Sequence, residues 1–122
     1  MLNRPTVVRV VVLLMTVAAG GCDAYMRVSA VVTDSGGAPL KGAAIVLSTK
    51  DDGIDHVSYT DAAGVGEGGL TYGPGSQPRL LTIGITGYKT FTVTLEPNHK
   101  YSCTVQLARE IDTNSSSGRC SQ

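Results

Sequence analysis

Residues 91–107 read FTVTLEPNHKYSCTVQL, and this stretch decides the fold class. Apolar residues occupy every second position on both sides of a turn at Pro97 and Asn98: Phe91, Val93 and Leu95 before it, then Tyr101, Cys103, Val105 and Leu107 after it. A period of two sends successive side chains to opposite faces of a strand. The stretch therefore predicts two strands, each with one buried face.

The same signal recurs along the chain, and no window after Cys22 has a helical period. Alternation predicts strands over residues 26–33 and 81–85, and Val57 with Tyr59 marks a short one. Residues 43–48 are apolar on both faces, which favours a central strand. Leu70 and Tyr72 mark the place of a seventh strand. We expect an all-β, seven-stranded antiparallel sandwich with these residues in its core: Val28, Ile45, Ile83, Phe91, Val93 and Val105.

The first 21 residues have the three parts of a signal peptide. Arg4 and Arg9 precede an apolar run over residues 10–19, and small residues follow at Gly20 and Gly21. The run is about half of the roughly 20 apolar residues that a membrane-spanning helix needs. We therefore expect cleavage after residue 21, which leaves 122 − 21 = 101 residues in the mature chain.

Cys22 directly follows the small residues Ala19, Gly20 and Gly21. This arrangement resembles the bacterial lipobox, which implies that Cys22 is the lipidation site and anchors the protein to a membrane of the bacterial cell envelope, on its periplasmic or outward-facing side. Lipoboxes usually have Leu where this chain has Ala19, so a secreted protein with an incidental cysteine is the alternative.

Charge and composition argue against nucleic acid as a partner. The 10 basic and 10 acidic residues of the full chain include Arg4 and Arg9, so the mature chain has 10 − 2 = 8 basic against 10 acidic residues. The sequence shows no cluster of Lys and Arg, and binding to phosphates requires grouped positive charge. Aromatic residues are also few, so the sequence indicates no wide stacking surface for bases.

The order of motifs in the mature chain resembles the carboxypeptidase regulatory-like domains. The motifs are VVTDSGGAPLKGA at residues 31–43, IVL at 45–47, TDAAG at 60–64 and IGITGYK at 83–89. In the third motif, Asp61 and Gly64 indicate a capped turn with a left-handed glycine. The resemblance departs from the family at Gly66, where an aromatic residue is usual. It implies a prealbumin-like (transthyretin-like) Greek-key sandwich that acts as a binding or structural module.

Candidate catalytic and metal-binding residues are few. His56 and His99 are the only histidines, so a three-histidine zinc site is excluded, and both are expected at the surface. The acidic loop at residues 50–55 lacks the spacing of a calcium-binding hand, which favours a solvated turn. We expect no catalytic residue, no metal and no cofactor. The alternative function is a small prealbumin-like hydrolase that uses His56 or His99, a reading that fails if the two lie at opposite ends of the sandwich.

Cys103 and Cys120 remain as a pair once Cys22 carries lipid. An even number of thiols in an oxidising compartment favours a disulfide. The alternation places Cys103 on an inward face, where a free cysteine also packs well as a small apolar residue. The disulfide is the expectation, and a buried free thiol is the alternative.

These observations divide the chain into four parts. We expect a lipoprotein signal peptide at residues 1–21, a lipidated cysteine with a short tether at 22–25, the sandwich at 26–109 and a mobile polar tail at 110–122. The expected function is that of a non-enzymatic, envelope-anchored lipoprotein. Its partners would be the membrane, through Cys22, and an envelope protein or glycan.

Overall fold

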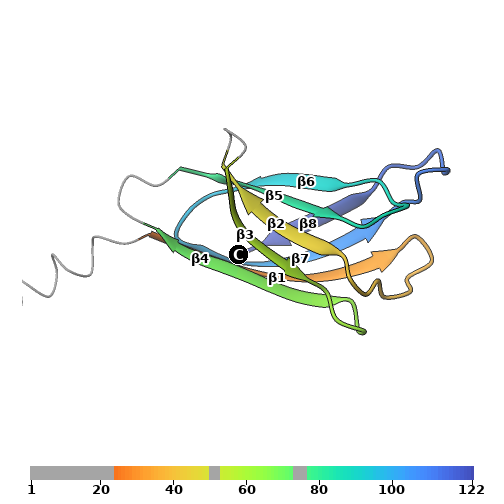
Figure 1. Ribbon diagram of the computed structural model, residues 1–122, viewed down its shortest axis with the longest axis horizontal. Helices are drawn as coiled ribbons and strands as arrows, with labels where there is room; N and C mark the ends of the chain where they lie inside the picture. Colours follow the sequence, from red (N-terminus) through yellow and green to blue (C-terminus); the bar gives the residue numbers. More distant parts are fainter. Residues whose placement is uncertain (1–23, 50–52, 73–76) are drawn as a thin grey trace, which may run out of the picture.

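The computed structural model describes residues 24–49, 53–72 and 77–122, and within these ranges every regular element is a strand (Figure 1). None of the described residues belongs to a helix that is long and apolar enough to cross a bilayer. The eight strands are β1 (Ala24–Asp34), β2 (Ala44–Ser48), β3 (Ile54–Tyr59), β4 (Val65–Tyr72), β5 (Arg79–Gly84), β6 (Phe91–Leu95), β7 (His99–Leu107) and β8 (Ser117–Ser121). The all-β expectation is confirmed, but the expected number of seven strands is wrong.

The strands form two sheets of four. The first sheet has the order β4-β1-β7-β8, and the second has the order β3-β2-β5-β6. All neighbours are antiparallel except β1 and β7, which run parallel from Met26 beside His99 to Asp34 beside Leu107. The expectation of a central strand over residues 43–48 is confirmed, because β2 lies between β3 and β5.

The core lies between the inward faces of the two sheets. The first sheet contributes alternate residues of β1 and β7, namely Met26, Val28, Ala30, Val32, Tyr101, Cys103, Val105 and Leu107. The second sheet contributes alternate residues of β2 and β5, namely Ile45, Leu47, Leu81 and Ile83, together with Leu95 of β6. Four of the six expected core residues are buried. Phe91 and Val93 are only half-buried, because they belong to the edge strand β6.

Two aspartates organise the turns that join the sheets. The Asp34 carboxylate accepts hydrogen bonds from the backbone N–H groups of Gly36 and Ala38, both at 2.9 Å. The Asp61 carboxylate accepts bonds from Ala63 at 2.9 Å and Val65 at 3.0 Å. Gly64 closes the second turn with a φ of 78°, a conformation that favours glycine. The capped turn expected from Asp61 and Gly64 is confirmed.

The C-terminal segment is not a free tail. Ser117–Ser121 pairs with β7 as the edge strand β8, so the expectation of a mobile tail over residues 110–122 is wrong. The Lys89 ammonium group donates hydrogen bonds to the carbonyl oxygens of Asp112 and Asn114, both at 2.6 Å. The Ser116 hydroxyl donates to the Lys89 carbonyl at 2.6 Å. These bonds order the connection between β7 and β8.

The first strand begins earlier than expected, inside the tether that was predicted at residues 22–25. Ala24 and Tyr25 already belong to β1, where they pair with Tyr72 and Thr71. Asn98 holds this end of the strand, because its N–H donates to the Tyr25 carbonyl at 2.6 Å and its side-chain oxygen accepts from the Tyr25 N–H at 3.2 Å. Every described strand and core residue lies within residues 24–121.

Candidate functional site

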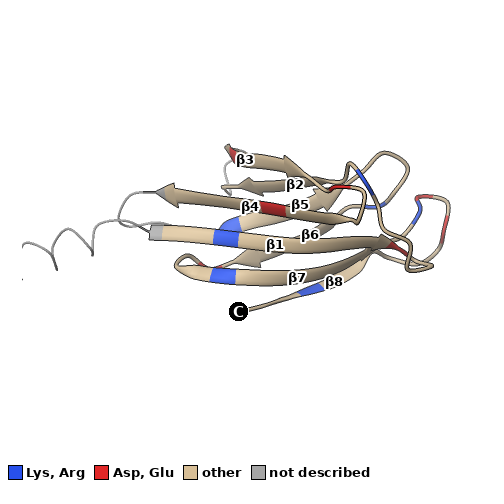
Figure 2. Cartoon of the chain, turned by 90° about the horizontal axis from the view of Figure 1, so that it is seen from below, with Lys and Arg blue, Asp and Glu red and all other residues tan. Residues whose placement is uncertain are grey.

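The outer face of the first sheet is polar, and we call it the polar face. It consists of the outward-facing residues of β1, β4, β7 and β8, which are mostly hydroxyl-bearing or charged: Tyr25, Arg27, Ser29, Val31, Thr33, Glu67, Thr71, Lys100, Ser102, Thr104, Gln106, Ser117, Arg119 and Ser121. Figure 2 shows the three cations on β1, β7 and β8, and the single carboxylate on β4. This face therefore has a net charge of 3 − 1 = +2.

A depression of about 800 Å³ lies at the end of the first sheet where β1 begins. Its lining includes outward-facing residues of three neighbouring strands: Tyr25, Arg27, Ser29, Thr71, Lys100 and Ser102. Glu67 and the inward-facing His56 and Tyr101 also border it. Hydroxyls, two cations and the Glu67 carboxylate thus surround a hollow that is open to solvent.

Arg27 and Lys100 are direct neighbours in this depression. They are partners in the parallel register of β1 and β7, so their backbones lie about 4.8 Å apart. Both side chains are exposed, and neither makes an ion pair or a hydrogen bond within the part of the chain that the structure describes. Gly69 lies beside Arg27 in the register, and a Cβ at residue 69 would be 3.4 Å from the Arg27 Cγ. Like charges on directly opposite positions destabilise a sheet. An anion between them would offset this repulsion.

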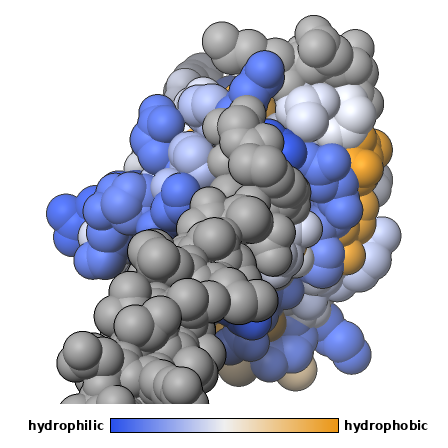
Figure 3. Space-filling model, turned by 90° about the vertical axis from the view of Figure 1, so that its left-hand side faces the viewer, coloured by the Kyte–Doolittle hydropathy of each residue, from blue (hydrophilic) through white to orange (hydrophobic). Residues whose placement is uncertain are grey.

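The outer face of the second sheet is apolar along its edge strand β3, and we call it the apolar face. A β-bulge between Leu47 and Ser48 brings Ile54 opposite Ser48, and so onto the same face as Val57 and Tyr59. Ile54 is 65% exposed, Val57 41% and Tyr59 65%. The half-buried Val46 and Leu80 continue this surface on β2 and β5. Figure 3 shows apolar side chains gathered in a strip along the right-hand side of that view.

The two histidines are half-buried rather than at the surface as expected. His56 faces inward from β3 toward β4, where a Cβ at Gly68 would be 3.2 Å from its Cδ2. His99 begins β7 and packs edge-on against Tyr101, with their ring centroids 5.9 Å apart. The register puts His99 beside Met26 of β1, and the partner of Met26 on its other side is Leu70, two positions along β4 from Gly68. The histidines therefore lie on different sheets but at the same end of the sandwich.

No catalytic set is assembled around either histidine among the described residues. Neither imidazole has a hydrogen bond or ion pair there. The Ser58 Oγ is 3.5 Å from the same Cβ position at Gly68, so it lies near His56, yet this buried hydroxyl has no hydrogen-bond partner. A serine nucleophile requires a hydrogen-bonded base that is oriented by a third group. Among the described residues, Ser58 has no hydrogen bond to His56, and no third group is hydrogen-bonded to His56.

The acidic loop and its neighbours do not form a metal site in the described ranges. Residues 50–52 of the loop lie outside the described part of the chain. Asp55 is the extra residue of the β-bulge, and its carboxylate accepts a hydrogen bond from the Arg79 Nε at 2.5 Å. Among the described residues no three His, Cys, Asp or Glu side chains come together in a way that could hold a metal ion.

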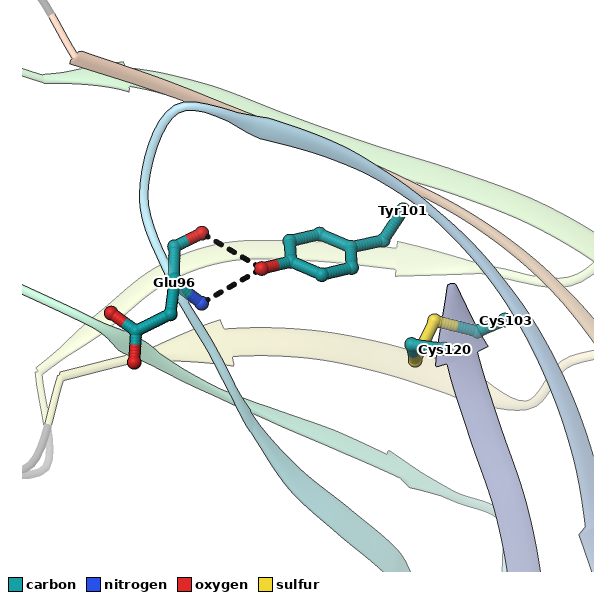
Figure 4. Close-up of a disulfide and its surroundings, with 4 residues drawn as sticks. All are labelled: Glu96, Tyr101, Cys103 and Cys120. Atoms are coloured by element: carbon teal, nitrogen blue, oxygen red, sulfur yellow. Dashed lines mark hydrogen bonds between the residues drawn. A yellow bond between two sulfur atoms is a disulfide. The ribbon is translucent and has the colours of Figure 1, made fainter. Parts of the chain in front are cut away.

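Cys103 and Cys120 are joined by a disulfide between β7 and β8 (Figure 4). The two residues are direct partners in the antiparallel register, and their Cα atoms lie 4.0 Å apart. On the same strand, the buried Tyr101 hydroxyl donates to the Glu96 carbonyl at 3.2 Å and accepts from the Glu96 N–H at 3.0 Å. The disulfide therefore links β8 to β7, and the Tyr101 side chain of β7 also orders the turn between β6 and β7.

Sequence reasoning did not find either outer surface. Arg27 and Lys100 are 73 residues apart in the chain, and only the parallel pairing of β1 with β7 makes them neighbours. The one signal in the sequence for this pair was the alternating pattern, which places both Arg27 and Lys100 at outward positions of their strands. Cys22, the expected lipidation site, lies outside the described residues.

Comparison with known proteins does not assign the chain to a family. No protein-family model matches the sequence, and no curated protein matches it. The resemblance to carboxypeptidase regulatory-like domains therefore rests on the sequence motifs themselves.

Proposed function

We propose that this protein is a lipid-anchored, non-enzymatic lipoprotein of the bacterial cell envelope, whose sandwich holds a protein partner on its apolar face. The observation that carries the proposal is the exposure of Ile54, Val57 and Tyr59 together along β3. Contiguous apolar patches rimmed by polar residues mark interaction sites on soluble domains. Tyrosine is also enriched where interfaces form. An apolar face favours a protein over a glycan as the partner.

The anchor is proposed to be a lipid on Cys22, after removal of residues 1–21. The start of β1 at Ala24 supports a short tether, since two residues span at most about 7 Å. Several acyl chains hold a protein stably on a membrane, whereas one is marginal. The sandwich would therefore be carried directly at the membrane surface.

The finer fold proposal is that β1 to β7 form a prealbumin-like Greek key. The motifs that carry the resemblance lie between residues 31 and 89, within the span of these seven strands. Gly66, where the family usually has an aromatic residue, faces the core opposite Ile45. In this proposal β8 is an addition to the fold, attached to β7 by the disulfide.

The test of partner binding compares both faces of the sandwich. Affinity isolation of the lipidated protein from its native envelope should recover a partner that is lost in Val57→Asp and Tyr59→Asp. The matched control is Thr104→Asp, which adds the same charge on the polar face and should keep the partner. Equal recovery with all three variants would refute binding through the apolar face.

The anchor is tested separately by detergent-phase partitioning. The wild-type protein should enter the detergent phase, and Cys22→Ser should remain in the aqueous phase. A Cys22→Ser variant that still enters the detergent phase would contradict lipidation.

A further inference from the structure

The anchor-proximal end of the polar face carries an unpaired pair of cations next to a depression. Arg27 and Lys100 lie side by side on β1 and β7, and the hydroxyls of Ser29 and Ser102 occupy the next outward positions of the same two strands. Guanidinium and ammonium groups with neighbouring hydroxyls are donors that suit a phosphate group. We infer that this depression, bounded by Arg27, Lys100, Ser29 and Ser102, binds the phosphate of an anionic lipid headgroup in the membrane that holds the protein.

The position of the pair along β1 favours a lipid as the source of the phosphate. This step rests on the proposed anchor at Cys22. The two residues from Cys22 to Ala24 span about 7 Å at most, and Arg27 is three strand residues farther, or about 10 Å. Tyr25, 40% exposed on the same face, lies between the anchor and the cations. Aromatic rings with a polar tip prefer such an interface between apolar and aqueous surroundings.

The distribution of charge supports the same orientation. The polar face has a net charge of +2, whereas the other described residues have 4 basic and 6 acidic side chains, or −2. Screening weakens such attraction over about 8 Å at physiological ionic strength, so the cations nearest the anchor contribute most. Lys41 follows the far end of β1, a strand of 11 residues that spans about 35 Å. It is therefore the matched lysine that should not reach the lipid.

The experiment attaches the chain to vesicles without relying on lipidation in the cell. Cys22 is the one cysteine outside the Cys103–Cys120 disulfide, so residues 22–122 can be coupled through it to a maleimide lipid. The vesicles contain phosphatidylcholine alone or mixed with phosphatidylglycerol. The rates at which an amine reagent acetylates Lys100 and Lys41 are measured by mass spectrometry. Because the coupling is chemical, the result does not depend on whether Cys22 is lipidated in vivo.

Lys100 should be acetylated about fivefold more slowly on the phosphatidylglycerol vesicles, the effect of one basic residue at an anionic surface. Lys41 should be unchanged, and Arg27→Glu should abolish the protection of Lys100. Equal protection on phosphatidylcholine alone, or equal protection of Lys41, would overturn the inference. Protection of Lys100 by inorganic phosphate without vesicles would assign the depression to a soluble ligand and overturn the lipid source.

Discussion

Gly66 lies directly against the end of the Ile45 side chain, so that a Cβ at residue 66 would overlap the Ile45 Cδ1. Ile45 is fully buried on the central strand β2, while Gly66 belongs to the edge strand β4 of the other sheet. The contact therefore closes the core between the two sheets, and it explains why a larger residue does not occupy position 66.

Gly66→Ala should lower the free energy of unfolding by about 1–3 kcal/mol, because an added methyl group overpacks a filled core. Urea denaturation measures the change. Ile45→Val removes the opposing Cδ1 and should reduce the penalty of Gly66→Ala when the two substitutions are combined. Additive effects of the two changes would show that the methyl groups do not meet.

Cys120→Ser should lower the free energy of unfolding by about 3 kcal/mol, since the disulfide closes a sequence separation of 17 residues. Residue 120 is chosen because Cys103 is buried, and a serine there would add an unrelated penalty. A reductant should shift the urea midpoint of the wild-type chain to that of the variant. If the reductant shifts the variant equally, the disulfide is not the source of the stability.

Thr60→Val should lower the free energy of unfolding by about 1–3 kcal/mol, because it removes the hydrogen-bond partner of one buried and one half-buried backbone group. The Thr60 hydroxyl donates to the Leu40 carbonyl at 2.6 Å and accepts from the Ala43 N–H at 2.9 Å. Thr92→Val, at an exposed position of β6, is the control and should change stability by less than about 0.5 kcal/mol. Thermal unfolding measures the loss of stability in both variants. A loss in Thr60→Val no larger than that in Thr92→Val would contradict a structural role for the Thr60 hydroxyl.

Lys89→Met should loosen the connection between β7 and β8 while leaving the core intact. The substitution removes the donors to the carbonyls of Asp112 and Asn114. Amide hydrogen exchange should become faster over residues 110–116 and stay unchanged in β5, since local opening does not require global unfolding. Lys41→Met serves as the control for the loss of a lysine. Faster exchange over residues 110–116 in this control variant would point to a general effect of charge.

Sequence patterns located seven of the eight strands but not the buried face of every one, since Val57 and Tyr59, which mark β3, face outward and are exposed. Apolar residues at every second position of β1 and β7 faced inward as expected, because a strand that is buried on one side permits only one register of its side chains. The turn at Asp61 and Gly64 was also predictable, since its geometry depends on the capping carboxylate and on a glycine with positive φ, both local properties.

The tertiary structure decided what depends on neighbours distant in the chain. Ser117–Ser121 has no apolar alternation, and it is a strand because β7 supplies its backbone partners, Cys103 its disulfide and Lys89 the bonds before it. His56 is half-buried because Gly68, on the other sheet, leaves room for its ring. Arg27 and Lys100 became a pair only through the parallel contact of β1 with β7. A local pattern determines which way a side chain points, but strand order determines what it meets, because register between distant segments is a property of the whole fold.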